Sequence, residues 1–514
     1  MKTLLRNTAV AAAVLTTAAL TAPEARADYP VEYEGRVSAG LGSGDFAPFY
    51  IASLDHGRYT RARSATLEVM ARRQIDRSRR FSYGFSLDIA GGYGNAVGYD
   101  RYSATDGWSV HDMRPSALWI QQLYGELKYR QVFLTAGMKE QRSKMLNQRL
   151  TSGDLAESGN TRPIAGVRAG FLDFVDIPLT RGAVQVFGEV GYGKFADSDW
   201  ITEQYNYYND HIVEGEYYNY KCIYLRSTPE KPLSVTIGMQ ATAIYGGYER
   251  FYNKGVMVQE ISYPAGLTTM LKMLVPYNDY AEGGFYTGDH RGTIDLKVRY
   301  RLTGGTELSA YMSNPWEDGS GLGKMNGWDG LWGLEYKASD PDAWVSGAVV
   351  EYLDLTNQSG PIHYDQSDFE GSTLGGHATG ADDYYNNRAH RPYTNYGLGI
   401  GTPMVMSTLY NTNGYASYMT NLTRGFHVAV EGRLSPTVRY RLKGGYRKAW
   451  GNGQFLLPKP LTLTAVMAEA EWRPARIAGL ALNGKIEIDR GTMPSNAFGA
   501  LVTLKYDGIF NLKK

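Results

Sequence analysis

The polar side chains between Lys144 and Arg168 are the first residues of this chain whose types and spacing suit chemistry. The stretch KMLNQRLTSGDLAESGNTRPIAGVR mixes glycines with strong hydrogen-bonding groups. Those groups belong to Asn147, Arg149, Ser152, Asp154, Ser158, Asn160 and Arg162. Amide, carboxylate and guanidinium groups match the hydroxyl arrays of sugars. The stretch therefore predicts either a saccharide-binding loop or a loop whose polar groups satisfy one another while they shape the mouth of the fold.

A second polar stretch, DDYYNNRAHRPYTNYGLGIG at 382–401, combines tyrosines with amides. Its candidate residues are Tyr384, Tyr385, Asn386, Asn387 and Tyr396. Aromatic rings offer flat platforms for sugar faces, and amides bind hydroxyl groups. The same tyrosines also suit the headgroup level of a membrane. The segment 200–220 has a similar tyrosine and asparagine content.

Signals for catalysis are weak throughout the chain. The triplet Ser158–Asn160 has no nucleophile elbow and no paired histidine, and Gly40–Gly44 is not followed by a helix as a phosphate-binding loop requires. Eight scattered histidines and one cysteine show no metal-ligand spacing. We therefore expect no catalytic residues, no metal, no cofactor and no enzymatic activity.

The N-terminus predicts export across a membrane. Lys2 and Arg6 precede a short apolar run at 9–20, and Ala25-Arg26-Ala27 is a typical cleavage site. We expect a signal peptide at 1–27 and a single domain at 28–514. Cys222 is the only cysteine, which excludes an intramolecular disulfide framework. The net charge of +1 gives no general attraction to nucleic acid.

Long alternating segments predict membrane-spanning strands. In Thr437–Arg447 apolar residues occupy one parity and cations the other, and 294–302, 480–489 and 498–510 repeat the pattern. These runs reach about nine residues or more, as tilted membrane strands require. We expect strands at 31–42, 61–75, 81–94, 117–129, 132–143, 165–177, 183–195, 220–228, 233–245, 290–302, 306–315, 330–338, 344–356, 424–434, 437–450, 461–473, 478–490 and 497–510.

Connections between these eighteen segments alternate between tight turns and longer loops, the longest being 246–289 and 357–423. An even strand count with short turns at one end and long loops at the other is typical of outer-membrane barrels. The fold class predicted is all-β: one antiparallel up-and-down barrel in the outer membrane, with periplasmic turns and extracellular loops. Helical spacing within 265–274 predicts a short helix over or in the barrel mouth.

The parity rule also predicts what faces the lumen. Apolar side chains would contact lipid, and the opposite parity would place Arg299, Arg301, Arg439, Arg441 and Lys443 inside. We expect interior acids to pair with these cations, the candidates being Asp295, Glu431, Glu469, Glu471 and Glu487. The final strand carries outward Tyr506 and Phe510. Lipid and the barrel-insertion machinery are therefore expected partners.

The segments 150–171 and 382–403 resemble the two most recognisable segments of the capsule assembly Wzi family. The shared features are a polar SGNxRP loop after the fifth strand and a YYNN…YGxGIGxP loop before the last quarter. The positions that match are Ser152, Gly153, Ser158, Gly159, Asn160, Arg162, Pro163, Tyr384, Tyr385, Asn386, Asn387, Tyr396, Gly397, Gly401 and Pro403. The resemblance implies an eighteen-stranded outer-membrane barrel that helps to attach capsular or related polysaccharide by lectin-like binding.

Three functions follow as hypotheses. The first is a non-catalytic barrel that binds capsular or extracellular polysaccharide at the cell surface. The second is a porin-like diffusion channel for small polar solutes, which the charged lumen would suit. The third, an outer-membrane enzyme acting on glycan or lipid, requires a catalytic constellation that the sequence does not contain. No feature of the sequence indicates an oligomeric state or a particular glycan.

Overall fold

The computed structural model describes residues 29–275, 287–317, 319–361 and 381–512. The signal peptide expected at 1–27 lies outside these described residues.

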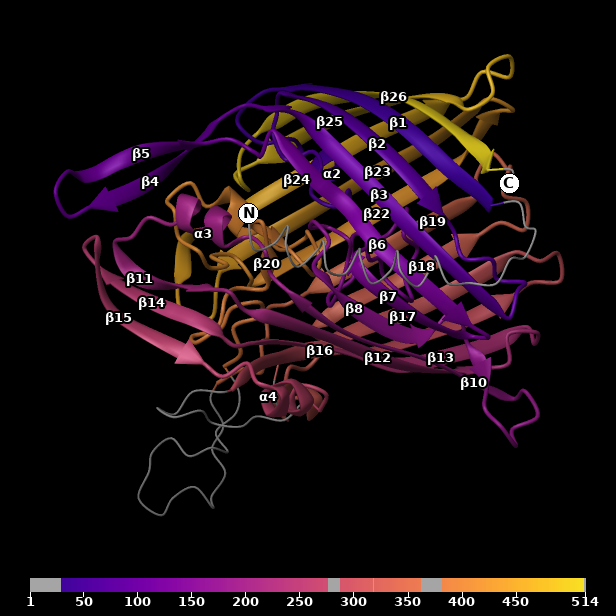
Figure 1. Ribbon diagram of the computed structural model, residues 1–514, viewed down its shortest axis with the longest axis horizontal. Helices are drawn as coiled ribbons and strands as arrows, with labels where there is room; N and C mark the ends of the chain where they lie inside the picture. The colour runs from indigo at the N-terminus through magenta and orange to yellow at the C-terminus, as the bar shows by residue number, and fades with distance from the viewer. Residues whose placement is uncertain (1–28, 276–286, 318, 362–380, 513–514) are drawn as a thin grey trace.

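Eighteen long strands form one closed antiparallel barrel (Figure 1). They are β1 (Tyr29–Gly42), β2 (Ser64–Arg73), β3 (Phe81–Gly94), β6 (Leu118–Tyr129), β7 (Val132–Met138), β8 (Ala165–Phe171), β10 (Val184–Lys194), β12 (Tyr217–Ser227), β13 (Leu233–Tyr245), β16 (Gly288–Arg301), β17 (Glu307–Trp316), β18 (Gly330–Lys337), β19 (Gly347–Asp354), β22 (Thr423–Ser435), β23 (Val438–Gly451), β24 (Leu456–Trp472), β25 (Leu480–Gly491) and β26 (Ala497–Leu512). The two-residue β9 (Val175–Asp176) pairs with β10 beside β8. Pairing of β1 with β26, from Tyr29↔Leu512 to Gly42↔Gly499, closes the sheet, which leaves no open edge. The predicted all-β barrel is confirmed.

The predicted strands coincide with the eighteen barrel strands and differ from them at their ends. The fifth strand, predicted at 132–143, is shorter than expected, since β7 ends at Met138. Gly137 has a φ of 122°, a conformation that L side chains rarely adopt. After this point the chain leaves the wall of the barrel and turns into its interior.

The two ends of the barrel differ in the size of their connections. At the long-loop end, small sheets project beyond the wall: β4 (Val97–Ser103) with β5 (Gly107–Met113), and β11 (Asn209–Glu214) with β14 (Gly247–Asn253) and β15 (Val256–Tyr263) (Figure 1). The short-turn end carries the described C-terminus and connections such as 130–131 and 436–437. Sequence analysis did not predict these small sheets within the loops.

The remaining elements are short and lie in the loops of the long-loop end. They are α2 (Phe49–Ala52), α3 (Ser198–Gln204), α4 (Leu267–Lys272), α5 (Gly319–Leu322), the 3₁₀ turn η2 (Thr408–Tyr410), and the paired β20 (Thr394–Asn395) and β21 (Leu398–Gly399). In the described part of the chain, no helix has the length and apolar character to cross a membrane.

The helix predicted at 265–274 exists as α4, but its predicted place at the mouth is wrong. The Tyr192 hydroxyl donates to the Met270 carbonyl at 2.8 Å, and Met273 packs against Tyr245. Both tyrosines lie on the outward parity of their strands, and α4 lies outside the wall (Figure 1). Helical spacing indicates that a segment is amphipathic without indicating which surface it will cover.

Side chains of the strands alternate between the two faces of the wall. In β25, Ile486 and Ile488 are 57% and 47% exposed, whereas Glu487 and Asp489 are 1% and 3% exposed. Apolar residues thus cover the outer surface while ionisable groups lie in the lumen. This is the arrangement of a barrel whose outer surface meets hydrocarbon.

Exposed aromatic side chains ring the outer surface near both ends of the barrel. Near the short-turn end these are Phe81, Tyr129, Tyr300, Trp344 and Trp472, and near the long-loop end they are Tyr93, Trp328, Tyr352, Phe426 and Phe498. Aromatic residues favour the interface between lipid and water, where an apolar ring and a polar tip are both satisfied. The two rings delimit an apolar band of outward side chains that includes Val69, Ile237 and Val466.

The facing of β23 predicts the effect of two neighbouring substitutions. Leu442 faces outward and is 45% exposed, whereas Lys443 is on the lumen parity. We expect Leu442→Arg to destabilise the inserted barrel by roughly 2–4 kcal/mol, because a cation would meet lipid. Lys443→Gln, the control, should insert normally. Heat-modifiable migration of membrane fractions measures insertion, and equal loss in both variants would contradict the facing.

Candidate functional site

The lumen of the barrel is occupied by loops that carboxylates of the wall hold in place. The first of these loops contains α2, between β1 and β2. The Phe49 N–H donates to Asp489 at 2.9 Å, and the Tyr50 and Ile51 N–H groups donate to Glu487 at 2.7 and 2.8 Å. These donors begin a helical turn and have no partner within it, so the two acids of β25 satisfy them.

The second loop, 139–164, enters the lumen between β7 and β8. Every residue from Leu150 to Asn160 is buried. Glu351 of β19 accepts hydrogen bonds from the Thr151 hydroxyl at 2.7 Å, the Ser152 N–H at 2.6 Å and the Tyr311 hydroxyl at 2.5 Å. One buried carboxylate therefore joins the loop to two strands of the wall.

His427 of β22 links the first two loops. Its Nε2 donates to the Leu150 carbonyl at 2.7 Å, and its Nδ1 accepts from the Tyr50 hydroxyl at 2.8 Å. Because a carbonyl can only accept, Nε2 carries a proton, and in the neutral imidazole Nδ1 is then the acceptor for the Tyr50 hydroxyl. A single side chain of the wall thus positions both loops.

The third loop, between β19 and β22, interlocks with the second. The Ser158 hydroxyl lies 2.7 Å from the Gly401 carbonyl and 3.1 Å from that of Ile400. The Asn160 amide donates to Gly399 at 3.2 Å, and the Tyr385 hydroxyl donates to Leu155 at 2.8 Å. The two stretches singled out in the sequence therefore contact each other across more than 200 residues of chain.

Tyrosine rings fill the space between these loops and the wall. Tyr385 and Tyr393 stack at a centroid distance of 5.7 Å and an angle of 12°, and Tyr218 of β12 hydrogen-bonds Tyr393 at 3.2 Å. A fully buried Arg391 forms a two-pronged ion pair with Asp197 at 2.6 and 2.8 Å. Stacked rings and a paired guanidinium give the third loop a rigid interior.

The predicted site residues of the second loop mostly contact the protein itself. Asp154 accepts from Ser143 at 2.5 Å, Asn147 donates to Glu335 at 3.0 Å, and Arg149 pairs with Glu431 at 2.6 Å. The Arg162 guanidinium lies over the rings of Trp119 and Tyr396 at 5.0 and 4.7 Å. Each of these side chains therefore interacts with another part of the chain.

Some of the predicted lumen cations form close ion pairs with glutamates, and others lie near the rim of the barrel. The Nε of Arg441 lies 2.8 Å from the Glu469 carboxylate, and the Arg299 guanidinium lies 2.9 Å from the Glu307 carboxylate. Arg301 also contacts Glu307, Arg439 is 3.3 Å from Asp342 near the short-turn end, and Lys443 lies 5.8 Å from the Tyr50 ring. Ion pairing with a predicted lumen cation is present for Glu469, whereas Glu431 and Glu471 pair with Arg149 and Arg473, outside the predicted set of cations. For Asp295 and Glu487 the predicted ion pairing is wrong within the described residues, since both accept hydrogen bonds from neutral donors.

A groove of about 600 Å³ opens at the long-loop end. We call it the outer groove; it is formed by 200–213, 383–394, 408–419 and 452–455. Two predicted residues, Asn386 and Asn387, line it beside Arg388, Tyr415 and Phe455. Phe455 is 67% exposed, and Arg388 has no carboxylate within ion-pair distance among the described residues. Aromatic faces, amides and a free guanidinium thus meet on one accessible surface.

Sequence analysis missed His211, Arg388, Tyr415 and Phe455 as groove residues. They belong to four separate segments, of which the sequence indicated two, the polar stretch 382–401 and the tyrosine- and asparagine-rich 200–220. Burial alone would lower the pKa of His211, but its hydrogen bond with Asp210 and the nearby Glu249 raise that pKa above its usual value. The groove therefore gains positive charge as the pH falls, and it does so at a higher pH than a free histidine would.

Among the described residues, no group of three or more His, Cys, Asp or Glu side chains is arranged to hold a metal ion. The site is therefore described by hydrogen bonds, aromatic surfaces and charge.

Comparison with known proteins shows similarity in fold. No protein-family model and no curated protein matches this sequence. A solved structure of Wzi, an outer-membrane protein involved in group 1 capsule assembly in Escherichia coli and described as a carbohydrate-binding β-barrel, is similar with a TM-score of 0.55. It is 12% identical, and the match covers 92% of this chain and 83% of that chain. Acinetobacter baumannii OccAB2 matches with a TM-score of 0.46 at 9% identity, over 94% of this chain and 98% of that chain. The likeness to Wzi shows that this chain has the fold of an outer-membrane barrel.

The hydrogen bonds between the second and third loops predict that removal of the Ser158 hydroxyl destabilises the protein. Ser158→Ala removes the donor to Ile400 and Gly401 and the acceptor of the Asn160 N–H, at 3.2 Å. We expect the free energy of unfolding to fall by about 1–3 kcal/mol, because buried polar groups lose their partners. Denaturant unfolding in detergent measures the change. Ser495→Ala, at an exposed loop position, is the control, and equal midpoints for both variants would contradict the interlock.

Proposed function

We propose that this barrel binds an extracellular polysaccharide, of the capsular kind, at its long-loop end and so helps to hold it at the cell surface. The outer groove is the observation that carries the proposal. It combines an exposed aromatic ring, amides and an unpaired guanidinium on the face that lies outside the cell in an outer-membrane barrel. Such a surface suits the hydroxyl groups and flat faces of sugars.

Eight of the twelve predicted sugar-binding residues divide into two sets under this proposal. Asn386 and Asn387 line the outer groove, where a glycan would contact them beside their own hydrogen bonds to Tyr418 and Asp289. Ser152, Asp154, Ser158, Asn160, Tyr384 and Tyr385 are buried, and we assign them to the support of the mouth. Their role is to hold the groove-forming loop on a fixed base, which lowers the entropy lost when a ligand binds.

A polysaccharide binds more tightly than a single sugar unit because its repeat units occupy several such sites. Each repeat unit offers the same modest contacts, and one chain engages several barrels in a membrane, so avidity exceeds the affinity of one site. The Wzi barrel is described as carbohydrate-binding and as involved in capsule assembly. The proposal extends that type of role to this chain, without catalysis.

A diffusion channel remains the alternative, and the charged lumen favours it. Eighteen strands enclose a wide interior. Against a channel, the second and third loops fill that interior with buried side chains from Leu150 to Asn160 and from Tyr393 to Asn395.

Loss of groove contacts should weaken glycan binding. We expect Phe455→Ala and Arg388→Gln each to reduce the affinity of detergent-purified protein for an oligosaccharide selected on a glycan array by roughly five- to tenfold. Trp108→Ala, which removes an exposed aromatic ring at the same end outside the groove, is the control. Biolayer interferometry measures the change. Unaltered binding by both groove variants would exclude the groove as the site.

The filled lumen predicts electrical behaviour. We expect the full protein to show no large, stable open-channel current in planar bilayers. Deleting 146–163 should raise conductance because this loop lies in the lumen, provided that the variant still migrates as a heat-modifiable barrel. Deleting 101–109, the tip of the β4–β5 hairpin, should leave conductance unchanged. A large current from the unaltered protein would favour the porin-like function.

A further inference from the structure

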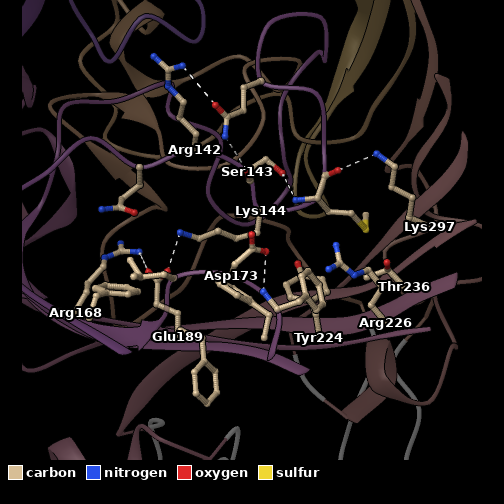
Figure 2. A pocket seen from close by; sticks show the side chains of 18 of the residues that line it. Arg142, Ser143, Lys144, Arg168, Asp173, Glu189, Tyr224, Arg226, Thr236 and Lys297 are labelled. Carbon is tan, nitrogen blue, oxygen red and sulfur yellow. Dashed lines mark hydrogen bonds and ion pairs between the residues drawn. The ribbon is translucent and has the colours of Figure 1, made fainter. Parts of the chain in front are cut away.

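A second cavity, of about 680 Å³, lies inside the barrel. The loops separate it from the outer groove. We call it the lumen cavity. Inward-facing side chains of β6, β7, β8, β10, β12, β13 and β16 form its wall, and residues 139–148 of the second loop cover it (Figure 2). Residues of short turns, Arg77, Asp173 and Pro229, also line it, and the first two are well exposed. The cavity therefore reaches the short-turn end, which faces the periplasm in an outer-membrane barrel.

The lining of this cavity is cationic. Eight lysines and arginines line it with only four aspartates and glutamates. In Figure 2, Arg142 and Lys144 extend from the covering loop, Arg142 toward Gln148, while Arg168 lies on one side and Arg226 and Lys297 lie on the other. The positive potential of these groups is concentrated by low-dielectric walls, which favours an anionic ligand.

Two of these cations have no carboxylate within ion-pair distance among the described residues: Arg142 and Arg226. The other six each have an acidic partner, such as Glu189 at 2.8 Å from Lys144 and Glu335 at 2.7 Å from Lys297. Arg226 is held in place, because its Nε and NH2 groups donate to Gln185 at 3.1 and 2.7 Å and its guanidinium lies 3.9 Å from the centre of the Phe174 ring. A pre-positioned guanidinium with a free edge suits a carboxylate.

Apolar rings and hydroxyl groups complete the lining. Phe133, Phe174 and Phe187 contribute ring surface, and Ser234 and Thr236 contribute hydroxyl groups. A volume of this size is within the range of small-molecule sites. Rings, hydroxyls and cations together match a sugar ring that carries a negative charge better than they match a simple anion.

We propose that the lumen cavity is a binding site for an acidic saccharide, a sugar ring bearing a carboxylate, that enters from the short-turn end. The site is separate from the outer groove, since residues 150–160 and the third loop lie between the two ends. It does not depend on the polysaccharide-binding role proposed for the groove. Arg226 binds the carboxylate, Arg142 adds positive charge from the covering loop, and the phenylalanine rings contact the sugar.

The test uses the full mature protein in detergent and D-glucuronate as the probe, with binding measured by calorimetry or by saturation-transfer NMR. We expect saturable binding that weakens with added salt and is absent for D-glucose at the same concentration. Arg142→Gln should weaken glucuronate binding about tenfold and Arg142→Gln with Arg226→Gln should abolish it, because positive charge and the charge-assisted hydrogen bonds of Arg226 are lost. Arg142 is exposed, so its single substitution leaves folding intact.

Two controls separate this site from the outer groove. Arg476→Gln, an exposed cation of the 473–479 turn outside the cavity, should bind glucuronate normally. Phe455→Ala should also bind it normally, whatever its effect on polysaccharide. No saturable binding, equal binding by the double variant, or loss in Phe455→Ala instead would overturn the proposal. Equal competition by inorganic phosphate would overturn the assignment to a sugar.

Discussion

The structure depends on the need to satisfy inward-facing carboxylates in a closed barrel. Parity of the strands sends apolar side chains outward, and the same rule sends Glu351, Glu487 and Asp489 into the lumen. A buried carboxylate without partners is costly, so these groups require donors. The loops supply them as backbone N–H groups and hydroxyls. Filling of the lumen is thus a consequence of how the wall is built.

This dependence also explains how two surfaces of different character arise on one barrel. The loops that satisfy the wall separate the interior into an outer part, with amides and aromatic rings, and an inner part rich in cations. Neither surface needs a catalytic group. Each presents a shape and a charge fixed by a rigid support, which the proposed binding of sugars would require.

The barrel could be predicted from the sequence because parity is a local property. Lys443 and Glu487 cannot face lipid, so their strand neighbours Leu442 and Ile486 face outward. This alternation can be read from one strand without knowledge of its partner. Placement of the loops could not be predicted in this way. The polar composition of 150–160 suggests solvent, yet the segment is buried, because its partners are supplied by Glu351, His427 and Gly401 from distant parts of the chain. The outer groove draws on four separate segments for the same reason, and α4 shows that helical spacing leaves the covered surface undetermined.

The hydrogen bond from Ser158 to Gly401 spans 243 residues and has a consequence for biogenesis. The second loop gains this partner only when the third loop is also inside the barrel. A barrel that had closed before both loops were seated would hold buried polar groups without partners, so closure of the wall and packing of the interior have to be completed together.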